Sequence, residues 1–337
     1  MSEPTRKLRW GILGAARVNE RLLPAIVEAR NSELAAIASR RPGAAAACLA
    51  RYAPGHGAKT YDALEPLLED PAVEAVYLPL ANQEHAEWGL KALEAGKHLL
   101  CEKPMALRVA DIEAIERAAL ERGLVAMEGF MYRFHPQHRR IRDLLDAGVL
   151  GDIRSVRATY SFTMRPARMY RIDRPPEQGG GAMWDIGCYA IHSLRTYLDT
   201  PPLAVAALAH HNAHGADTGM SGVVDFGGGR HGLFDFSFER ARRSEYEIIG
   251  TQGGAKCHTV WQLPGDTPVV SWWTEDGREG VERLAPANHF RLEVEHFADC
   301  VLEGRTPALA LADAKANCRL VGAALRSAAT GRAERLD

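Results

Sequence analysis

The stretch of sequence that decides the fold reads Leu99-Leu100-Cys101-Glu102-Lys103-Pro104-Met105. It continues an apolar strand that we expect over residues 98–101, and it ends in an acid, a base and a proline. Proline lacks an N–H group and fixes φ, so Pro104 ends the strand and stiffens the turn that carries Lys103. In an open parallel α/β sheet, ligands bind beyond the carboxyl ends of the strands. We therefore interpret Lys103 as pointing toward a ligand; the alternative is a charged turn that merely follows a strand.

The strands and helices around this stretch alternate along the first half of the chain. Apolar runs typical of strands cover residues 9–13, 34–38, 73–78, 98–101 and 124–127, and helical spacing covers residues 18–29, 44–52, 84–94 and 109–122. Such alternation predicts right-handed βαβ units and a parallel sheet. Asp62 and Glu65 also form a capping-box pattern that predicts a helix start. We place this first domain at residues 1–128.

A nucleotide-binding loop is expected directly after the first strand. The pattern Gly-x-Gly-x-x-Gly is typical there, and this chain has Gly14-Ala15-Ala16-Arg17-Val18-Asn19. Gly14 allows the tight turn, whereas Ala16 and Asn19 replace the glycines that let backbone approach a pyrophosphate and let the helix pack on the strand. We interpret the first four residues of the run as cofactor contacts; a strand–helix turn without a ligand is the alternative.

The end of the second strand indicates which nicotinamide cofactor is bound. An acid there accepts hydrogen bonds from the ribose of NAD, whereas an arginine pairs with the 2′-phosphate of NADP. This chain has Ser39, Arg40 and Arg41, with no acid before Asp62. A serine hydroxyl and a guanidinium group both donate hydrogen bonds to phosphate. We therefore favour NADP(H), with NAD(H) or an unliganded basic surface loop as alternatives.

The second half of the chain has a different pattern. Strands are expected at residues 156–162, 203–208, 222–226, 232–238, 245–249, 255–260 and 268–273, and helices at residues 136–147, 290–302 and 311–330. The turn Gly227-Gly228-Gly229 joins two of these strands as a hairpin. The pattern predicts a second domain over residues 129–337, with a large, mostly antiparallel open sheet that has one face solvated or used for association. The whole chain is therefore expected to be of the α/β class.

One helix in this half carries polar groups suited to chemistry. The run Gly179-Gly180-Gly181 leads into it, and Asp185, Tyr189 and His192 follow at spacings that place them on one face. Gly187 inside the helix costs ~1 kcal/mol against alanine, which indicates a close approach by a ligand or by backbone. We interpret this face as a candidate catalytic surface; an amphipathic helix that faces solvent is the alternative.

Composition excludes several functional classes. The 337 residues exceed what one compact core usually needs, and the 41 basic and 43 acidic residues are spread evenly, so we expect neither nucleic acid nor a disordered tail. No apolar run reaches the ~18 residues that cross a bilayer, and residues 1–9 lack the apolar core of a signal peptide. The six scattered cysteines form no Cys-x-x-Cys pair, which favours reduced thiols and a cytoplasmic location. The histidines at 210, 211 and 214 lack a convergent ligand shell, so no metal is expected.

Four blocks of residues, in order, carry a family resemblance. They are Trp10 to Ala16, Ala95 to Pro104, Met127 to Pro136 and Gly179 to Tyr189. Together they resemble the glucose–fructose oxidoreductase/inositol dehydrogenase/rhizopine catabolism (Gfo/Idh/MocA) family over nearly the whole chain. Within it, the chain is most similar to the branch with dihydrodiol dehydrogenases, NADP-linked xylose dehydrogenases, anhydrofructose reductases and deoxysugar ketoreductases. The resemblance implies a Rossmann domain, an α/β domain with a large antiparallel sheet, and a homodimer or homotetramer formed through that sheet.

The resemblance also implies roles for individual residues. Lys103 would be the catalytic lysine beside the nicotinamide, Tyr189 would exchange the substrate's hydroxyl proton, and Asp185 would orient the substrate or Tyr189. The remaining expected cofactor contacts are Leu80, Asn82, His85 and Glu102. The remaining expected substrate contacts are Tyr132, Arg171 and His192, and His192 stands where relatives often carry Asn, Gln or Asp.

The expected function is hydride transfer between NADP(H) and a hydroxyl or carbonyl carbon of a sugar or cyclic polyol, a small-molecule substrate. One alternative is a ketoreductase that acts on a nucleotide-linked deoxysugar, in which arginines between Arg165 and Arg174 would meet a diphosphate. The other is a non-catalytic NADP-binding sensor. Such a sensor needs neither Lys103 nor Tyr189, so the presence of both favours an enzyme.

Overall fold

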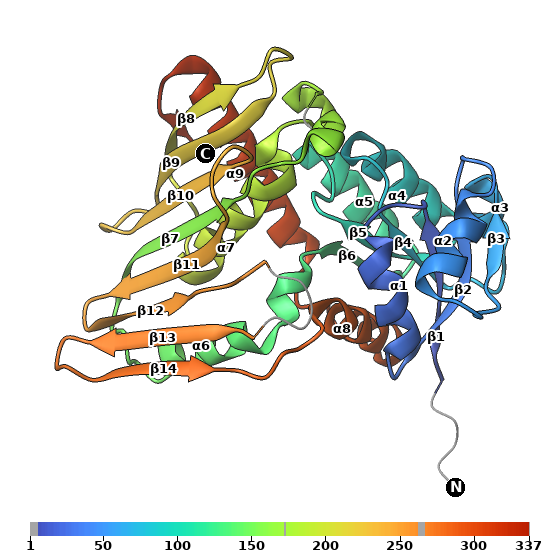
Figure 1. The fold of residues 1–337 in the computed structure, drawn as a ribbon, viewed down its shortest axis with the longest axis horizontal. Helices are drawn as coiled ribbons and strands as arrows, with labels where there is room; N and C mark the ends of the chain where they lie inside the picture. The colour runs from blue at the N-terminus through green and yellow to red at the C-terminus, as the bar shows by residue number, and fades with distance from the viewer. Residues whose placement is uncertain (1–5, 172, 262–266, 337) are drawn as a thin grey trace, which may run out of the picture. The chain divides into compact units, whose positions relative to one another are not determined.

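The computed structural model describes residues 6–171, 173–261 and 267–336, which divide into two compact units (Figure 1). The first unit runs to Phe134 and also takes in Asn288–Lys315. The second comprises His135–Ala287 and the chain from Ala316 onward. The sequence pattern predicted one domain over residues 129–337, whereas the segment Asn288–Lys315 packs with the first unit.

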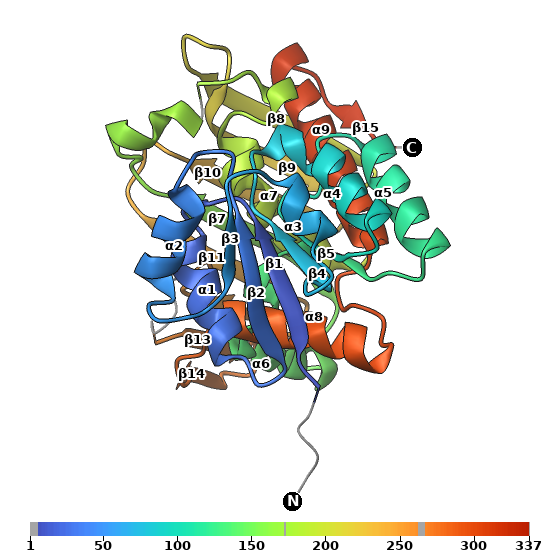
Figure 2. The same cartoon turned by 90° about the vertical axis from the view of Figure 1, so that its right-hand side faces the viewer.

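Within the described residues, the first unit holds a parallel six-stranded sheet in the order β3-β2-β1-β4-β5-β6; Figure 2 shows β1, β2 and β3 side by side. Its strands are β1 (Leu8–Leu13), β2 (Ser32–Ala38), β3 (Lys59–Tyr61), β4 (Ala75–Leu78), β5 (His98–Glu102) and β6 (Ala126–Gly129). Its helices in the segment up to Phe134 are α1 (Asn19–Glu28), α2 (Ala44–Tyr52), α3 (Glu65–Glu69), α4 (His85–Glu94) and α5 (Val109–Glu121). The predicted parallel sheet and its alternation with helices are confirmed.

The core of this unit lies on both faces of the sheet. Leu99, Leu100 and Cys101 on β5 are all fully buried, as are Trp10 and Ile12 on β1. Strands covered on both sides read as continuous apolar runs, which is why the sequence showed them clearly. The short edge strand β3 has only three residues and gave no such signal.

The predicted capping box at Asp62 and Glu65 is wrong. Helix α3 begins at Glu65 with Leu64 as its N-cap residue, so Asp62 lies too early to cap it. The Asp62 carboxylate instead accepts a hydrogen bond from the amide of Gly43, at 2.8 Å. Gly43 has a φ of 71° and precedes α2, so Asp62 holds the turn that starts that helix.

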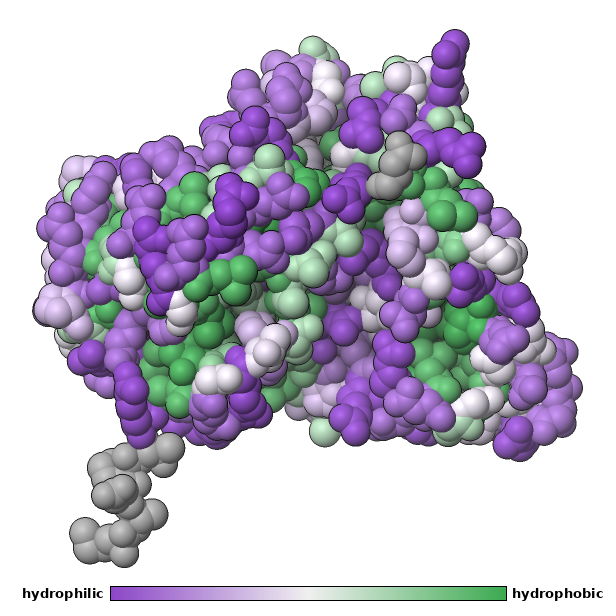
Figure 3. Space-filling view, turned by 180° about the vertical axis from the view of Figure 1, so that it is seen from behind, coloured by the Kyte–Doolittle hydropathy of each residue, from purple (hydrophilic) through white to green (hydrophobic). Residues whose placement is uncertain are grey.

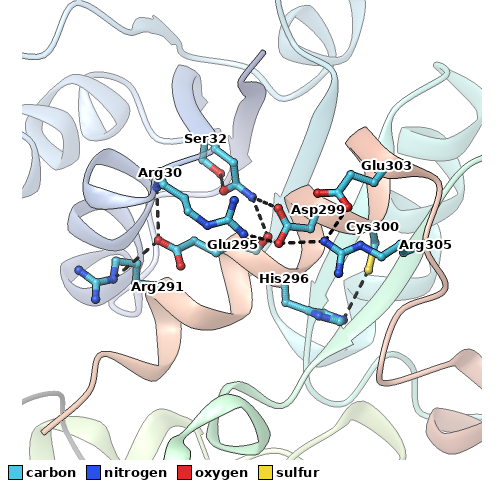
Figure 4. Close-up of polar contacts among 10 residues, drawn as sticks. Arg30, Ser32, Arg291, Glu295, His296, Asp299, Cys300, Glu303 and Arg305 are labelled. Carbon is cyan, nitrogen blue, oxygen red and sulfur yellow. Dashed lines mark hydrogen bonds and ion pairs between the residues drawn. The ribbon is translucent and has the colours of Figure 1, made fainter. Parts of the chain in front are cut away.

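Helix α8 (His289–Glu303) is held to the first unit by a polar cluster (Figure 4). The side-chain amide of Asn31, which is 2% exposed, donates to the Glu295 carbonyl oxygen at 2.8 Å and to Asp299 Oδ1 at 2.6 Å. Arg30 and Arg305 both form ion pairs with the same Asp299 carboxylate. Phe297 of α8 also packs against Trp10 of β1, with ring centroids 5.2 Å apart. These contacts explain why α8 belongs to the first unit although it follows the second in sequence.

The second unit holds, among the residues described, a nine-stranded sheet in the order β14-β13-β12-β11-β7-β10-β9-β8-β15. The strands are β7 (Ile153–Ser161), β8 (Ala204–His211), β9 (Asp217–Asp225), β10 (His231–Ser237), β11 (Arg243–Gly250), β12 (Gly253–Cys257), β13 (Val269–Thr274), β14 (Glu279–Arg283) and β15 (Glu334–Arg335). Its helices include α6 (Pro136–Asp146), the π-helical turn η5 (Met183–Gly187), α7 (Cys188–Leu198) and, from Ala316 onward, α9 (Leu311–Thr330). β7 and β10 pair in parallel and the other neighbours are antiparallel, so the predicted mostly antiparallel sheet is confirmed.

The two faces of this sheet differ in their surroundings. Helices α6 and α7 pack on one face, and the side chains of Phe234, Phe236 and Tyr246 are buried there. The opposite face carries Leu208 and Val223, which are 77% and 42% exposed.

In the part of the chain that the structure describes, no helix is both long and apolar enough to span a membrane. On the surface that Figure 3 shows, hydrophilic residues separate the hydrophobic groups.

Candidate active site

The nucleotide loop begins where β1 ends. Gly14 has a φ of +132°, a conformation that side chains rarely adopt. A Cβ atom on Gly14 would also lie 3.0 Å from Leu80 Cδ2. Leu80 follows β4, so the two residues flank the point where the strand order reverses between β1 and β4, which is where dinucleotides bind in such sheets. The structure thus gives Gly14 the tight turn that the sequence predicted.

Asn19 stands at the position of the third glycine in the loop. It is fully buried, and its side-chain amide donates to the Gly14 carbonyl oxygen at 2.8 Å. The same nitrogen lies 3.3 Å from Cys48 Sγ on α2. Asn19 Oδ1 is buried and has no hydrogen-bond partner in the described structure. Asn19 is the first residue of α1, so its side chain ties the start of this helix to the loop.

The end of β2 is connected to this loop by hydrogen bonds. The Arg41 guanidinium donates to the Ala15 carbonyl oxygen at 2.9 Å, and the Arg41 amide donates to Ser39 Oγ at 3.2 Å. Arg40 is about half exposed and forms an ion pair with Glu84, at 2.6 Å. The sequence analysis missed Glu84, because it lies after β4, in the turn η1 (Asn82–Glu84), and far from Arg40 in sequence. One guanidinium group thus bonds the loop, and the guanidinium group of the preceding residue is paired with an acid.

The turn after β5 is fixed from several directions. The peptide bond between Lys103 and Pro104 is cis. Glu102 accepts a hydrogen bond from the Tyr77 hydroxyl group, and the Met105 amide donates to Glu128 Oε1 at 2.6 Å. Lys103, half-buried, lies between these anchored residues at the carboxyl edge of the sheet.

His85 holds the same turn rather than presenting its ring at the surface. Its Nδ1 lies 2.7 Å from the Pro104 carbonyl oxygen and its Nε2 lies 3.0 Å from the Leu80 carbonyl oxygen. The residue is fully buried, and burial lowers the pKa of the imidazole. Both ring nitrogens therefore face backbone oxygens, and the cofactor contact expected of His85 stays a prediction.

A buried acid that the sequence did not indicate interacts electrostatically with Glu102. Glu293 on α8 is 1% exposed, and its Oε1 has no hydrogen-bond partner in the described part of the chain. Burial, reinforced by the negative charge of Glu102, holds the pKa of Glu293 well above its usual range. No local pattern marks this residue, because only the packing of α8 brings it near β5.

In the second unit, Asp185, Tyr189 and His192 lie on one continuous helical segment, as predicted. Asp185 is in the π-helical turn η5, and such turns are frequent at functional sites. Tyr189 is 6% exposed and packs near Tyr160 and Trp261, with ring centroids 6.1 and 6.0 Å away. His192 is 1% exposed. The helix therefore does not simply turn a polar edge to solvent.

The other predicted contacts are spread over both units. Arg17 is exposed and lies 3.9 Å from Glu20 on α1, and Asn82 begins η1. Tyr132 is fully buried in the first unit, in the turn η2 (Met131–Phe134), where its ring meets Phe130 edge-on. Arg171 ends the turn η3 (Pro166–Arg171), and its side chain lies outside the described part of the structure.

The strand order of the first unit and its glycine turn define a dinucleotide-binding protein of the Rossmann class. Residues 8–130 match the model of an oxidoreductase family with an NAD-binding Rossmann fold. Residues 138–256 match the model of the GFO/IDH/MocA C-terminal domain. The chain belongs to the Gfo/Idh/MocA oxidoreductase family, which confirms the resemblance that the sequence motifs carried.

Individual relatives cover almost the full chain. It is 35% identical to D-xylose 1-dehydrogenase (NADP(+)) 2 of Haloferax volcanii over 98% of this chain and 100% of that protein. It is 33% identical to KijD10, a 3-ketoreductase from Actinomadura kijaniata solved with NADP and TDP-benzene; the TM-score is 0.87, with 96% of this chain and 98% of that chain covered. An aldose-aldose oxidoreductase from Caulobacter crescentus, complexed with glycerol, is 26% identical with a TM-score of 0.88, over 98% of this chain and 100% of that one.

Proposed function

We propose that the protein transfers hydride between NADP(H) and a hydroxyl or carbonyl carbon of a sugar or cyclic polyol. The observation that carries the proposal is the anchored turn of Lys103, which places an amine at the carboxyl edge of a dinucleotide-binding sheet. An unanchored lysine there would fit a solvated surface loop equally well. The similarity to a xylose dehydrogenase that uses NADP(+) supports the same class of substrate.

The residues of the nucleotide loop fit a nicotinamide dinucleotide. A Cβ atom at Gly14 would fill the space beside Leu80, and Asn19 leaves a buried oxygen without a partner in the described structure. Gly14 to Arg17 would hold the pyrophosphate, and Ser39, Arg40 and Arg41 would hold the 2′-phosphate of NADP. When bound, this cofactor supplies or accepts the hydride.

The protein's own groups would handle the proton of the reacting hydroxyl. A free phenol has a pKa near 10 and is a poor base at neutral pH, but a nearby ammonium group favours its ionised form. We assign the proton transfer to Tyr189, the ammonium group to Lys103, and the orientation of the substrate hydroxyl to Asp185. Glu102, itself bonded to Tyr77, holds the backbone from which Lys103 extends.

Substituting the two central groups tests this assignment. K103M and Y189F should each lower kcat by about 10²-fold or more, because general acid–base catalysis contributes that much. The measurement is NADP+ reduction over a panel of aldoses and cyclic diols, with circular dichroism to show that the variants fold. Near-normal turnover in both folded variants would overturn the proposal.

A ketoreductase that acts on a nucleotide-linked deoxysugar is the second candidate. The structural similarity to KijD10, solved with TDP-benzene, favours it. Arg165 and Arg168 precede the glycine run in the segment that would meet a diphosphate. A preference for nucleotide-linked sugars over free aldoses in the same panel would select this candidate, and nucleotide binding without any turnover would indicate a sensor.

Self-association through the large sheet is part of the proposal. Its uncovered face carries the exposed side chains of Leu208 and Val223, and a concavity on this face is lined by these residues and by Leu233. Apolar residues exposed together are typical of interaction sites. We therefore propose a homodimer or homotetramer. The six cysteines are all buried thiols, which fits the cytoplasmic location expected from the sequence.

A further inference from the structure

The helix with the predicted catalytic side chains begins against a buried acid from another element. Asp217, the first residue of β9, is fully buried, and its Oδ2 accepts a hydrogen bond from the Met183 amide at 2.6 Å. The amide of Ala182 also stabilises the Asp217 carboxylate. Ala182 is the N-cap residue of η5 and has no side chain that could cap the helix. Asp217 therefore supplies from β9 the anionic cap that the helix N-terminus favours.

The glycines before and inside this helix allow the acid and the sheet to approach it. Gly181 has a φ of +93°, and a Cβ atom on it would lie 2.1 Å from Asp217 Oδ1. A Cβ atom on Gly187 would lie 2.6 Å from the ring of Phe236 on β10. The close approach predicted at Gly187 is thus made by an aromatic ring, and not by a ligand or by backbone. The start of the helix is fitted closely against two neighbouring strands.

We propose that Asp217 is a positioning residue, which fixes the N-terminal end of the helix that carries Asp185 and Tyr189. The inference rests on the proposed function, because it assigns those two side chains to the reaction. Met183, whose amide bonds Asp217, lies two residues before Asp185 within the same π-helical turn. A small shift of that turn displaces Asp185 directly and Tyr189 through the following helix. Misplacing a catalytic group by about 1 Å can cost about 10²-fold in rate.

The charge of Asp217 sets the strength of this anchor. Burial raises the pKa of Asp217 to about 7, although three backbone amides lower it. Three elements that pack against β9 carry titratable groups: β8 has His210 and His211, β10 has His231 and Asp235, and η5 has Asp185. Of these, His211 is the pairing partner of Asp217. A carboxylate accepts hydrogen bonds only, and a hydrogen bond to a charged group is stronger than one between neutral groups. The anchor should therefore weaken as Asp217 becomes protonated.

The test compares D217N with D225N. Both residues are on β9, and the Asp225 carboxylate also accepts a backbone amide hydrogen bond, from Gly227 at 2.8 Å, so D225N is a matched control at the other end of the strand. D217N should lower kcat about tenfold or more and leave the Kd of NADPH within twofold of wild type. In the wild type, kcat should fall as Asp217 becomes protonated near pH 7, and D217N should not show this fall. D225N should keep the wild-type kcat and pH profile. A wild-type kcat and pH profile in D217N would overturn the proposal.

Amide hydrogen exchange tests the anchor without any substrate. In the wild-type protein, protection at Ala182 and Met183 should decrease as the pH is lowered through 7, beyond the change in intrinsic exchange rate. D217N should show the reduced protection at every pH, and D225N should not. If protection of these two amides in the wild type did not depend on pH, the proposal would be overturned even if D217N failed to fold. The exchange could depend on pH as expected while the enzyme turned over no sugar or nucleotide sugar. That result would reject the proposed function and the catalytic roles of Asp185 and Tyr189, but the contact between Asp217 and the helix would still be supported.

Discussion

His85 Nδ1 lies 2.7 Å from the carbonyl oxygen of Pro104, so a fully buried imidazole on α4 holds the turn that presents Lys103. A neutral imidazole carries one N–H group and can donate to only one of the two backbone oxygens that it faces, and burial favours that neutral form by lowering the pKa of His85. We take Nδ1 as the protonated nitrogen, because its oxygen is the nearer of the two. The second oxygen, from Leu80, then lies beside an unprotonated nitrogen.

This arrangement predicts different effects for two substitutions of His85. In H85N the side-chain amide can replace Nδ1 as a donor, whereas H85F leaves the buried Pro104 oxygen without one. We expect H85F to lower the free energy of unfolding by about 1–3 kcal/mol, the cost of an unsatisfied buried polar group, and to lower kcat. H85N should retain most of both. Denaturant titration and steady-state kinetics measure the two effects, and equal losses in both variants would contradict the donor role.

A second prediction concerns the ion pair between Arg40 and Glu84. R40A should weaken the binding of NADPH about tenfold or more and leave the binding of NADH nearly unchanged, because only NADPH has a 2′-phosphate. E84Q should tighten the binding of NADPH by a few-fold, since Glu84 competes with the phosphate for Arg40 across an exposed pair worth under about 1 kcal/mol. Fluorescence titration gives both dissociation constants. Equal losses for NADPH and NADH in R40A would reject the contact with the 2′-phosphate.

The candidate residues that the sequence could mark are those whose placement depends on near neighbours along the chain. Lys103 follows a buried strand directly, Gly14 ends another, and Tyr189 follows Asp185 by one helical turn, so short patterns predicted all three. Asp217 bonds the amide of Met183, and the pKa of Glu293 responds to the charge of Glu102. Both partners are distant in sequence, and neither acid has a pattern around it. Their contacts exist only after β9 has paired in its sheet and α8 has packed on the first unit.

The strands that the sequence analysis missed have a physical explanation of the same kind. β3 and β15 have three and two residues, too few to show a period, and β14 alternates exposed with half-buried residues at the edge of its sheet. Such strands are defined by the partner with which they pair. The apolar runs of β1 and β5, by contrast, follow from burial on both faces and are visible in any reading of the chain.

The last prediction concerns the dependence of stability on pH that Glu293 should cause. Its pKa in the folded protein is raised well above the value of an unfolded glutamate, by burial and then by the charge of Glu102. The unfolded state therefore loses the proton at lower pH than the folded state does. The stabilisation from the protonated form is complete below about pH 4.3, the pKa of an unfolded glutamate, and is lost progressively as the pH rises toward the folded pKa.

E293Q removes this ionisation and keeps the shape of the protonated side chain. The free energy of unfolding of E293Q, minus that of the wild type, should therefore become more positive from pH 5 to pH 8, by up to about 1.4 kcal/mol per pH unit. E303Q, at an exposed glutamate on the same helix, controls for the loss of one charge and should show no such trend. Urea titrations at each pH give the free energies of unfolding of the variants and the wild type. If the value for E293Q minus that for the wild type stayed constant with pH, Glu293 would already be ionised in the folded protein. The carboxyl group would then need a cation beside it, and Lys103, next to Glu102, would be the first to examine by repeating the titration in K103M.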